Sequence, residues 1–316
     1  MKVITQVEEF PQDANHVAVA LGNFDGVHIG HQTILKKLVE KAQSEKGISV
    51  VFTFNPHPLN ILKKDNCPML LTELEDKKNL IIKLEVDYLL LFPFSINIAQ
   101  MPPKDFVENI LIKNLHAKSV FVGYNFTFGK RAEGNAELLK QICREHKCDV
   151  TVVPEVKFQN YSVSSTTIRK LLAEGKIRQA NTLLGYAYNV SGIVVPGDQR
   201  GRKIGFPTAN LNTSSNVMIP KNGVYAVRVL TENGFYHGIA NIGIRPTIGN
   251  NLSRTIEVHL FQEFINLYDK KLRVFFIEHL REEKKFNDLQ ELSQQIKLDI
   301  EKAKIILQLS DNMDQY

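Results

Sequence analysis

The sequence lacks the usual marks of a secreted or membrane-bound protein. Its 316 residues include only three cysteines, and no two of them form a CxxC pair. An odd cysteine count without an apparent secretory leader argues against a disulfide framework. No uncharged apolar run is long enough to span a bilayer, which excludes membrane insertion. We therefore expect a cytoplasmic protein without a membrane partner.

A strong charge of one sign is also missing. Lys and Arg number 39 against 34 Asp and Glu, which gives a formal net charge of +5. This balance suits anionic ligands, but it is too mild to indicate a nucleic-acid binder without a concentrated basic patch. The sequence has no basic stripe and no aromatic RNA-reading motif, so we expect small phosphorylated ligands and no nucleic acid. The length favours two domains over one.

The first half alternates strand patterns with helix patterns. This alternation predicts a mostly parallel sheet covered on both faces, with a ligand in the crevice beyond the carboxyl ends of the strands. Thr72 and Glu75 have the spacing of a capping box at a helix start. Strands are expected at 16–21, 50–54, 88–92, 118–122 and 149–153, and helices at 32–46, from 72, from 102 and at 135–147.

The second half is β-rich. Short strands separated by turn residues, one of them an Asn-Gly hairpin turn at 233–234, predict a small antiparallel barrel. A long helix from Asn287 carries an apolar stripe that we interpret as a packing face. We place the domains at 1–184 and 185–316. The strands are expected at 189–195, 223–230, 235–241, 255–261 and 272–276.

One segment between the first strand and the first helix carries the most chemistry. In LGNFDGVHIGH, residues 21–31, Gly22, Gly26 and Gly30 permit close backbone approach. His28 and His31 share one face at a helix start, where free N–H groups and the helix dipole attract phosphate. This pattern predicts a triphosphate cradle; the alternative is a glycine-rich turn with two exposed histidines. Two histidines alone are too few for a zinc site.

Three further segments of the first half suggest ligand contacts. Asn55-Pro-His-Pro58 ends the second strand at the same sheet edge, although it fits a rigid loop equally well. In GYNFTFGKR, residues 123–131, five residues separate the glycines where a P-loop has four, but Asn125 and the basic residues can still bind phosphate. SSTTIR, residues 164–169, opens a helix with hydroxyls and one Arg, or merely caps it.

These motifs, in this order, resemble the adenylyltransferase half of bacterial bifunctional riboflavin kinase/FAD synthetases. The resemblance implies a Rossmann-like nucleotidyltransferase domain in which His28 and His31 stabilise the transferring α-phosphate. It also implies a flavin contact by Asn55 and His57. The implied ATP or phosphate contacts in this half are Gly22, Asn23, Phe24, Asp25, Gly30, Asn125, Ser164, Thr166 and Arg169.

A second glycine-rich and basic loop lies between strands of the β-rich half. It covers residues 197–210 and ends in Pro-Thr-Ala-Asn. Thr208 and Asn210, two apart on an extended chain, can offer oxygens to one Mg²⁺ ion. The alternative is a mobile basic surface loop. Glu257 lies on an alternating strand together with Thr255 and His259, where it is either a catalytic base or an outward-facing glutamate.

GRKIGFPTANL and NIGIRPT resemble the signatures of the riboflavin kinase module. The resemblance implies that Thr208 and Asn210 contact ATP and Mg²⁺, that Arg245 contacts the flavin, and that Glu257 activates the ribityl 5'-hydroxyl of riboflavin. It further implies phosphate contacts by Gly201, Lys203 and Gly205. The expected enzyme phosphorylates riboflavin to FMN and adenylylates FMN to FAD, with ATP and flavins as its small-molecule partners.

Overall fold

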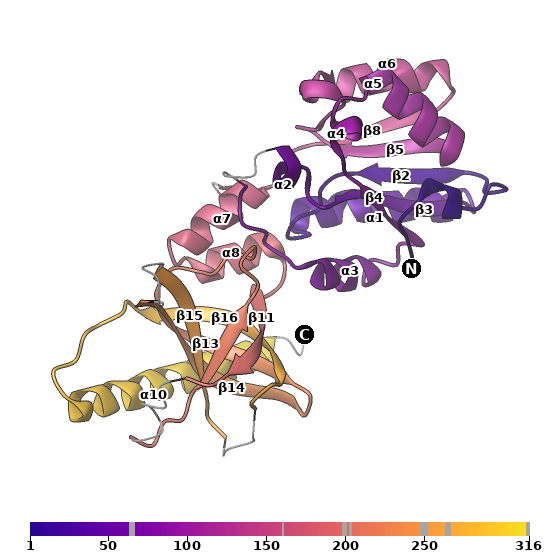
Figure 1. Cartoon of the computed structure of the whole chain (residues 1–316). Coiled ribbons are helices and arrows are strands. Elements are labelled where there is room, and N and C mark those ends of the chain that lie inside the picture. The colour runs from indigo at the N-terminus through magenta and orange to yellow at the C-terminus, as the bar shows by residue number, and fades with distance from the viewer. Residues whose placement is uncertain are drawn as a thin grey trace. The chain divides into compact units, whose positions relative to one another are not determined.

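A computed structural model gives the structure of the chain, which divides into two compact units, Met1–Ser165 and Thr166–Tyr316 (Figure 1). We describe each unit by itself. The described residues are 1–62, 67–159, 161–197, 201, 204–246, 252–262 and 267–313, with the backbone alone at 245–246, 252–253 and 311–313.

The first unit is built on a six-stranded sheet in which every strand pair is parallel, as the alternating pattern predicts. The strand β1 was not expected, because three residues are too few to show a periodic pattern. The sheet order is β1-β4-β3-β2-β5-β8. The strands are β1 (Lys2–Ile4), β2 (Val17–Leu21), β3 (Ile48–Asn55), β4 (Tyr88–Pro93), β5 (Ala117–Gly123) and β8 (Asp149–Val153).

Helices cover both faces of this sheet (Figure 1). Strand β2 is buried throughout and sends alternate residues to two cores: Val19 to the core under η2 and α6, and Ala18 and Ala20 to the core under α1 and α3. The helices are α1 (Ile29–Ser44), α2 (Pro58–Leu62), α3 (Leu74–Ile82), α4 (Ile96–Ala99), α5 (Pro103–Asp105), η2 (Phe106–Asn114) and α6 (Ala136–Glu145). Short elements are η1 (Val7–Glu9), η3 (Lys130–Ala132), β6 (Thr127–Phe128), β7 (Gly134–Asn135), β9 (Lys157–Phe158) and β10 (Tyr161–Ser162).

The predicted capping box at Thr72 is wrong. Helix α3 has Glu73 at its N-cap, without a side-chain cap. The Thr72 hydroxyl instead accepts a hydrogen bond from the backbone N–H of Gly26 at 3.2 Å. A contact with a segment 46 residues away has therefore taken the place of the local cap. Helix α1 begins at Ile29, earlier than expected, because His28 serves as its N-cap.

The second unit contains a closed barrel with antiparallel strand pairs, as predicted. A two-residue turn joins Thr231 to Gly234, which confirms the hairpin. Residues 209–213 form a strand that the sequence analysis did not predict, and the first two of them were expected at the end of the loop 197–210. The barrel order is β11-β12-β15-β14-β13-β16. Its strands are β11 (Asn189–Val195), β12 (Ala209–Thr213), β13 (Gly223–Thr231), β14 (Gly234–Pro246), β15 (Leu252–Leu260) and β16 (Lys271–Arg281).

Helices pack on the outside of the barrel. Ala303 and Leu307 of α10 (Leu289–Met313) are fully buried against a cluster that includes Val224 and Leu280, so the apolar stripe is a packing face. All but the first residue of α7 (Ser165–Ala173) and the whole of α8 (Ile177–Leu184) also fall in this unit. The domain boundary at 184 stays a prediction.

Candidate functional sites

The first candidate site follows β2 at the point where the strand order of the sheet reverses. Strand β2 pairs with β3 on one side and with β5 on the other, so the loops after β2, β3 and β5 leave the sheet at one edge. A crevice at such a switch point is the usual ligand site of an open parallel sheet.

The loop after β2 has a strained backbone. Phe24 and Val27 have positive φ angles of 47° and 34°, and Gly26 has 80°. Phe24 is fully buried, and a Cβ at Gly22 would lie 3.1 Å from its ring. Residues other than glycine adopt such conformations only where their surroundings hold them, and such strain concentrates at functional sites.

Residues 71–77, distant in sequence, hold this loop in place. The buried Asp25 carboxylate accepts hydrogen bonds from the backbone N–H groups of Leu71 at 3.0 Å and Thr72 at 3.3 Å. The Lys77 ammonium donates to the Asn23 carbonyl oxygen at 2.8 Å. Asp25, expected as a phosphate contact, also anchors the loop through these hydrogen bonds.

The two histidines lie face to face. Their ring centroids are 3.6 Å apart at an interplanar angle of 16°, and the backbone N–H of His31 donates to Nδ1 of His28 at 3.2 Å. His31 also packs edge-on against Phe24 at 5.2 Å. Burial, together with the nearby His28 and Lys77, holds the pKa of His31 well below its usual value. His31 is therefore neutral near pH 7.

The His31 Nδ1 atom is buried and has no hydrogen-bond partner within the described part of the chain. A buried polar atom without a partner is costly, so a ligand that supplies one gains affinity. A Cβ at Gly30 would lie 3.2 Å from the His28 ring, which explains the glycine between the two histidines.

The other predicted residues of this unit lie in different surroundings. Asn55 is exposed at the end of β3, and His57 Nδ1 accepts from the Leu59 N–H at 3.3 Å at the start of α2. Asn125 is exposed in a turn closed by a hydrogen bond from the Phe126 N–H to the Gly123 carbonyl at 3.1 Å.

The SSTTIR segment begins α7. Ser164 precedes the helix, and the next serine, which sequence reasoning did not single out, donates its hydroxyl to the Asp25 carbonyl oxygen at 2.9 Å. This contact adds another anchor to the loop after β2. Thr166 and Arg169 belong to the second unit.

The second candidate site lies on the outer face of the barrel. Glu257 is directly opposite Asn210 of β12 and also opposite Asn241 of β14. Its neighbours Ile256 and Val258 are buried, so the half-buried Glu257 points to the other face of β15. The pairing of β12 with β15 could not be predicted, because residues 209–213 were not predicted as a strand.

Asn210 is buried, and its Oδ1 has no hydrogen-bond partner among the described residues. Gly197 covers it so closely that a Cβ there would lie 2.1 Å from the Asn210 Nδ2 atom. The half-buried Thr208 lies two residues before Asn210 along the same chain segment. Two neutral oxygen donors beside a carboxylate are a donor set that suits a hard divalent cation.

Hydrogen bonds hold two backbone carbonyls of the loop before β12. The Gly201 carbonyl accepts from the Phe206 N–H at 2.8 Å, and Gly205 has a φ of +87°. His259 Nδ1 donates to the Pro207 carbonyl oxygen at 2.9 Å, and burial lowers the pKa of His259. Lys203 and the side chain of Arg245 lie outside the described residues.

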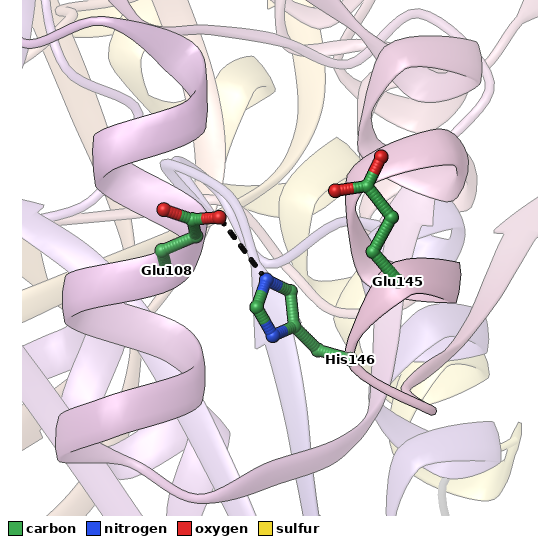
Figure 2. A group of neighbouring side chains, drawn as sticks. All are labelled: Glu108, Glu145 and His146. Atoms are coloured by element: carbon green, nitrogen blue, oxygen red, sulfur yellow. Dashed lines mark hydrogen bonds and ion pairs between the residues drawn. The ribbon is translucent and has the colours of Figure 1, made fainter.

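One further group of possible metal ligands occurs among the described residues. Glu108, Glu145 and His146 bring ligand atoms within 4.8 Å of one another, from η2 and the end of α6 (Figure 2). His146 Nε2 already pairs with Glu108 Oε1 at 3.2 Å, and Lys104 lies 3.7 Å from the same carboxylate. These contacts describe a hydrogen bond between the end of α6 and η2, with a lysine beside the same carboxylate.

None of the described helices combines the length and apolar character that crossing a membrane requires.

Comparison with known proteins assigns each unit. A family model described as FAD synthetase matches residues 10–167, and one described as riboflavin kinase matches residues 184–307. Bifunctional riboflavin kinase/FMN adenylyltransferases are similar over nearly the whole chain. The relative from Buchnera aphidicola subsp. Schizaphis graminum is 37% identical over 96% of this chain and 98% of its own. The relative from Bacillus subtilis is 37% identical over 90% of each chain.

A solved structure described as a macrolide-efflux protein from Streptococcus pneumoniae superposes with a TM-score of 0.87, at 30% identity, over 96% of this chain and 98% of that one. Kinases and adenylyltransferases of these families generally use a divalent metal ion. The matches assign both halves of the expected reaction, the phosphorylation of riboflavin to FMN and the adenylylation of FMN to FAD. The chain belongs to the bifunctional riboflavin kinase/FMN adenylyltransferases.

Proposed function

We propose that each activity has its own site: adenylyl transfer at the loop after β2, and riboflavin phosphorylation on the outer face of β12 and β15. One observation carries this proposal. Each of the two family matches covers one cluster of polar side chains, the stacked His28 and His31 in the first and the paired Asn210 and Glu257 in the second.

In adenylyl transfer, an FMN phosphate oxygen attacks the α-phosphate of ATP and pyrophosphate leaves. The nucleophile is already anionic, so the site needs no base and must instead stabilise the charge that develops on the phosphate. We assign that role to His28 and His31, with the neutral His31 acting as a hydrogen-bond donor. Asn55 and His57 are assigned to the flavin of this site, and Arg245 is assigned to the riboflavin of the kinase site. The backbone of residues 22–25 and Gly30, with Asn125 and Ser164, is assigned to ATP, and the ATP contacts expected of Thr166 and Arg169 stay predictions from the sequence.

In riboflavin phosphorylation, the nucleophile is a neutral alcohol. A base that removes its proton in the transition state makes it more nucleophilic. We assign this role to Glu257, which would take the proton of the ribityl 5'-hydroxyl while the oxygen forms its bond to the γ-phosphate of ATP. Gly201, Lys203 and Gly205 are assigned to the phosphates of that ATP.

We further propose that the divalent ion is Mg²⁺ and that Thr208 and Asn210 hold it in the kinase site. The buried, unpartnered Oδ1 of Asn210 supports this assignment among the described residues. When bound, Mg²⁺ would neutralise phosphate charge during transfer. The expected cytoplasmic location and the domain limits 1–184 and 185–316 remain part of the proposal.

The test is a product analysis on the purified chain. Riboflavin with ATP and Mg²⁺ is expected to give FMN and then FAD, and FMN supplied directly is expected to give FAD and pyrophosphate. Chromatographic separation of the three flavins follows each step. A chain that makes FMN but never FAD, or the reverse, would mean that one unit serves only as a scaffold.

A further inference from the structure

A buried lysine lies under the loop that carries the two histidines. Lys77 follows the apolar spacing of helix α3, between Leu74 and the fully buried Ile81, yet it is only 7% exposed. Lysine is almost never buried to this degree unless it is paired. Lys77 forms no ion pair within the described part of the chain, and its Nζ atom donates a hydrogen bond to the Asn23 carbonyl.

The charge of Lys77 is therefore only weakly compensated. The nearby carboxylate is Asp25, whose oxygens accept from the backbone N–H groups of Leu71 and Thr72. Burial lowers the pKa of Lys77, and Asp25 opposes that shift. Placing an ammonium in such surroundings costs free energy, and an anionic ligand nearby would recover part of it.

His28 and His31 are titratable groups on the same loop. The positive charge of Lys77 is one of the causes that keep His31 unprotonated. His31 consequently contributes a hydrogen-bond donor, while Lys77 supplies the amine of this region.

We propose that Lys77 is a positioning residue of the adenylyl-transfer site: it holds the Asn23 carbonyl, and thereby the loop after β2, and it supplies positive charge behind the histidines for the triphosphate of ATP. This inference rests on the proposed role of His28 and His31. It separates two functions of one side chain, a hydrogen bond and a charge.

A substitution at Thr53 tests the hydrogen bond to the Asn23 carbonyl separately from the charge. The Thr53 hydroxyl donates to the same Asn23 carbonyl at 3.2 Å. Thr53→Val weakens the hold on the loop without changing any charge. Lys78, the next residue on α3, pairs with Glu75 at 2.8 Å, so Lys78→Met removes a lysine charge from the same helix away from the loop.

The experiment compares Lys77→Met, Lys77→Arg, Thr53→Val, Lys78→Met and His31→Ala in the full chain. For Lys77→Met we expect kcat/KM for ATP in FAD formation to fall about 10²-fold, as for loss of one electrostatic contact at the reacting phosphate. FMN formation from riboflavin, which reports on folding, should stay within about twofold. Lys77→Arg and Thr53→Val should lose several-fold, and Lys78→Met should match the parent.

A second readout is the pKa of His31, followed by NMR titration of its ring proton. It should rise in Lys77→Met, because a neighbouring positive charge has been removed, but not in Lys77→Arg. If Lys77→Met does not fold, Lys77→Gln, which keeps a donor without the charge, is measured with the same expectation.

The outcomes separate this inference from the proposed function. Near-normal FAD formation in His31→Ala would overturn the histidine assignment itself. A strong loss in His31→Ala together with near-normal FAD formation in Lys77→Met would overturn the role of Lys77 alone. Equal losses of kcat/KM in Thr53→Val and Lys77→Met, with an unchanged pKa of His31, would show that Lys77 acts only through its hydrogen bond and would contradict the proposed role of its charge.

Discussion

The two units place their polar side chains by different means. In the first unit the histidines lie beyond the end of β2, on a loop with positive φ angles that is held by contacts with Leu71, Thr72 and Lys77. In the barrel, Asn210 and Glu257 lie on the strands themselves, and the register of β12 against β15 sets them opposite each other.

This difference determines which distant residues matter. The position of a side chain on a barrel strand follows from backbone pairing that any residue can make, so changes around Glu257 should act locally. The histidine loop depends on side chains that lie 30 to 140 residues away in sequence. Substitutions outside the loop should therefore damage adenylyl transfer more readily than riboflavin phosphorylation.

The largest expected effect is at Glu257. Glu257→Gln keeps the size of the side chain and removes its basicity, so FMN formation should fall by about 10² to 10⁴. FAD formation from supplied FMN should stay at the parental rate. Single-turnover phosphate transfer at saturating riboflavin and ATP measures the effect. The control is Glu232→Gln, because Glu232 forms an exposed ion pair with Lys270 in the same unit. A kinase rate of Glu257→Gln within a few-fold of the parent would mean that Glu257 has only a structural role.

His28→Ala should have the converse effect. Loss of one donor at the reacting phosphate should lower FAD formation from FMN by roughly 10² to 10³, with FMN formation from riboflavin retained. Steady-state rates of both steps on the same preparation measure the split. His116, half-buried with a φ of +52°, adopts a backbone conformation that Asn also favours, so His116→Asn is the control. Loss of both activities together would show that the loop serves folding instead of one reaction.

The barrel should depend on α8 for stability. The Asn181 side chain donates to the Phe276 carbonyl at 2.9 Å and accepts from the Tyr188 N–H at 2.8 Å. Asn181→Ala leaves two backbone groups without these partners, so the free energy of unfolding should fall by roughly 2 to 4 kcal/mol. Urea unfolding of a 166–316 fragment measures it.

Truncation extends the same test. A fragment 185–316 lacks α8 and should be less stable than 166–316. Equal stability and equal FMN formation in the two fragments would place the functional boundary at 184 and remove α8 from the folding unit.

The smallest expected effect is a pH dependence in the barrel. His279 Nε2 is buried without a partner among the described residues, and burial lowers the pKa of His279. The unfolded chain then binds more protons below about pH 6.5, so stability is full above that pH and is lost as the pH falls. The loss is at most about 1.4 kcal/mol per pH unit. Urea unfolding at pH 7.5 and 5.5 should show a flatter dependence in His279→Gln, while identical slopes would exclude His279 as the cause.

Much of the fold could be predicted from local pattern. The alternation of strand and helix patterns correctly predicted the parallel sheet, and regular short strands with an Asn-Gly turn correctly predicted the barrel. The segment Ala209–Thr213 was not predicted as a strand because Ala and Asn, three of its five residues, are depleted in strands, and pairing with β11 and β15 decides its conformation.

The candidate sites divide in the same way. The glycines and histidines after β2 indicated a phosphate loop, but the anchoring of Asp25 and Lys77 depends on tertiary contacts that no local spacing contains. The position of Lys77 on an otherwise apolar face of its helix was the one local sign that this lysine is buried. The neutral state of His31 depends on burial and could not be predicted from the sequence.

The stacking of His28 on His31 also limits how many protons the pair can bind. With ring centroids 3.6 Å apart, a proton on one imidazole raises the free energy of adding a second to the other. The two rings therefore titrate as one unit with two macroscopic steps. A pH–rate profile for FAD formation will report the occupancy of that unit, and an inflection in it belongs to neither histidine alone.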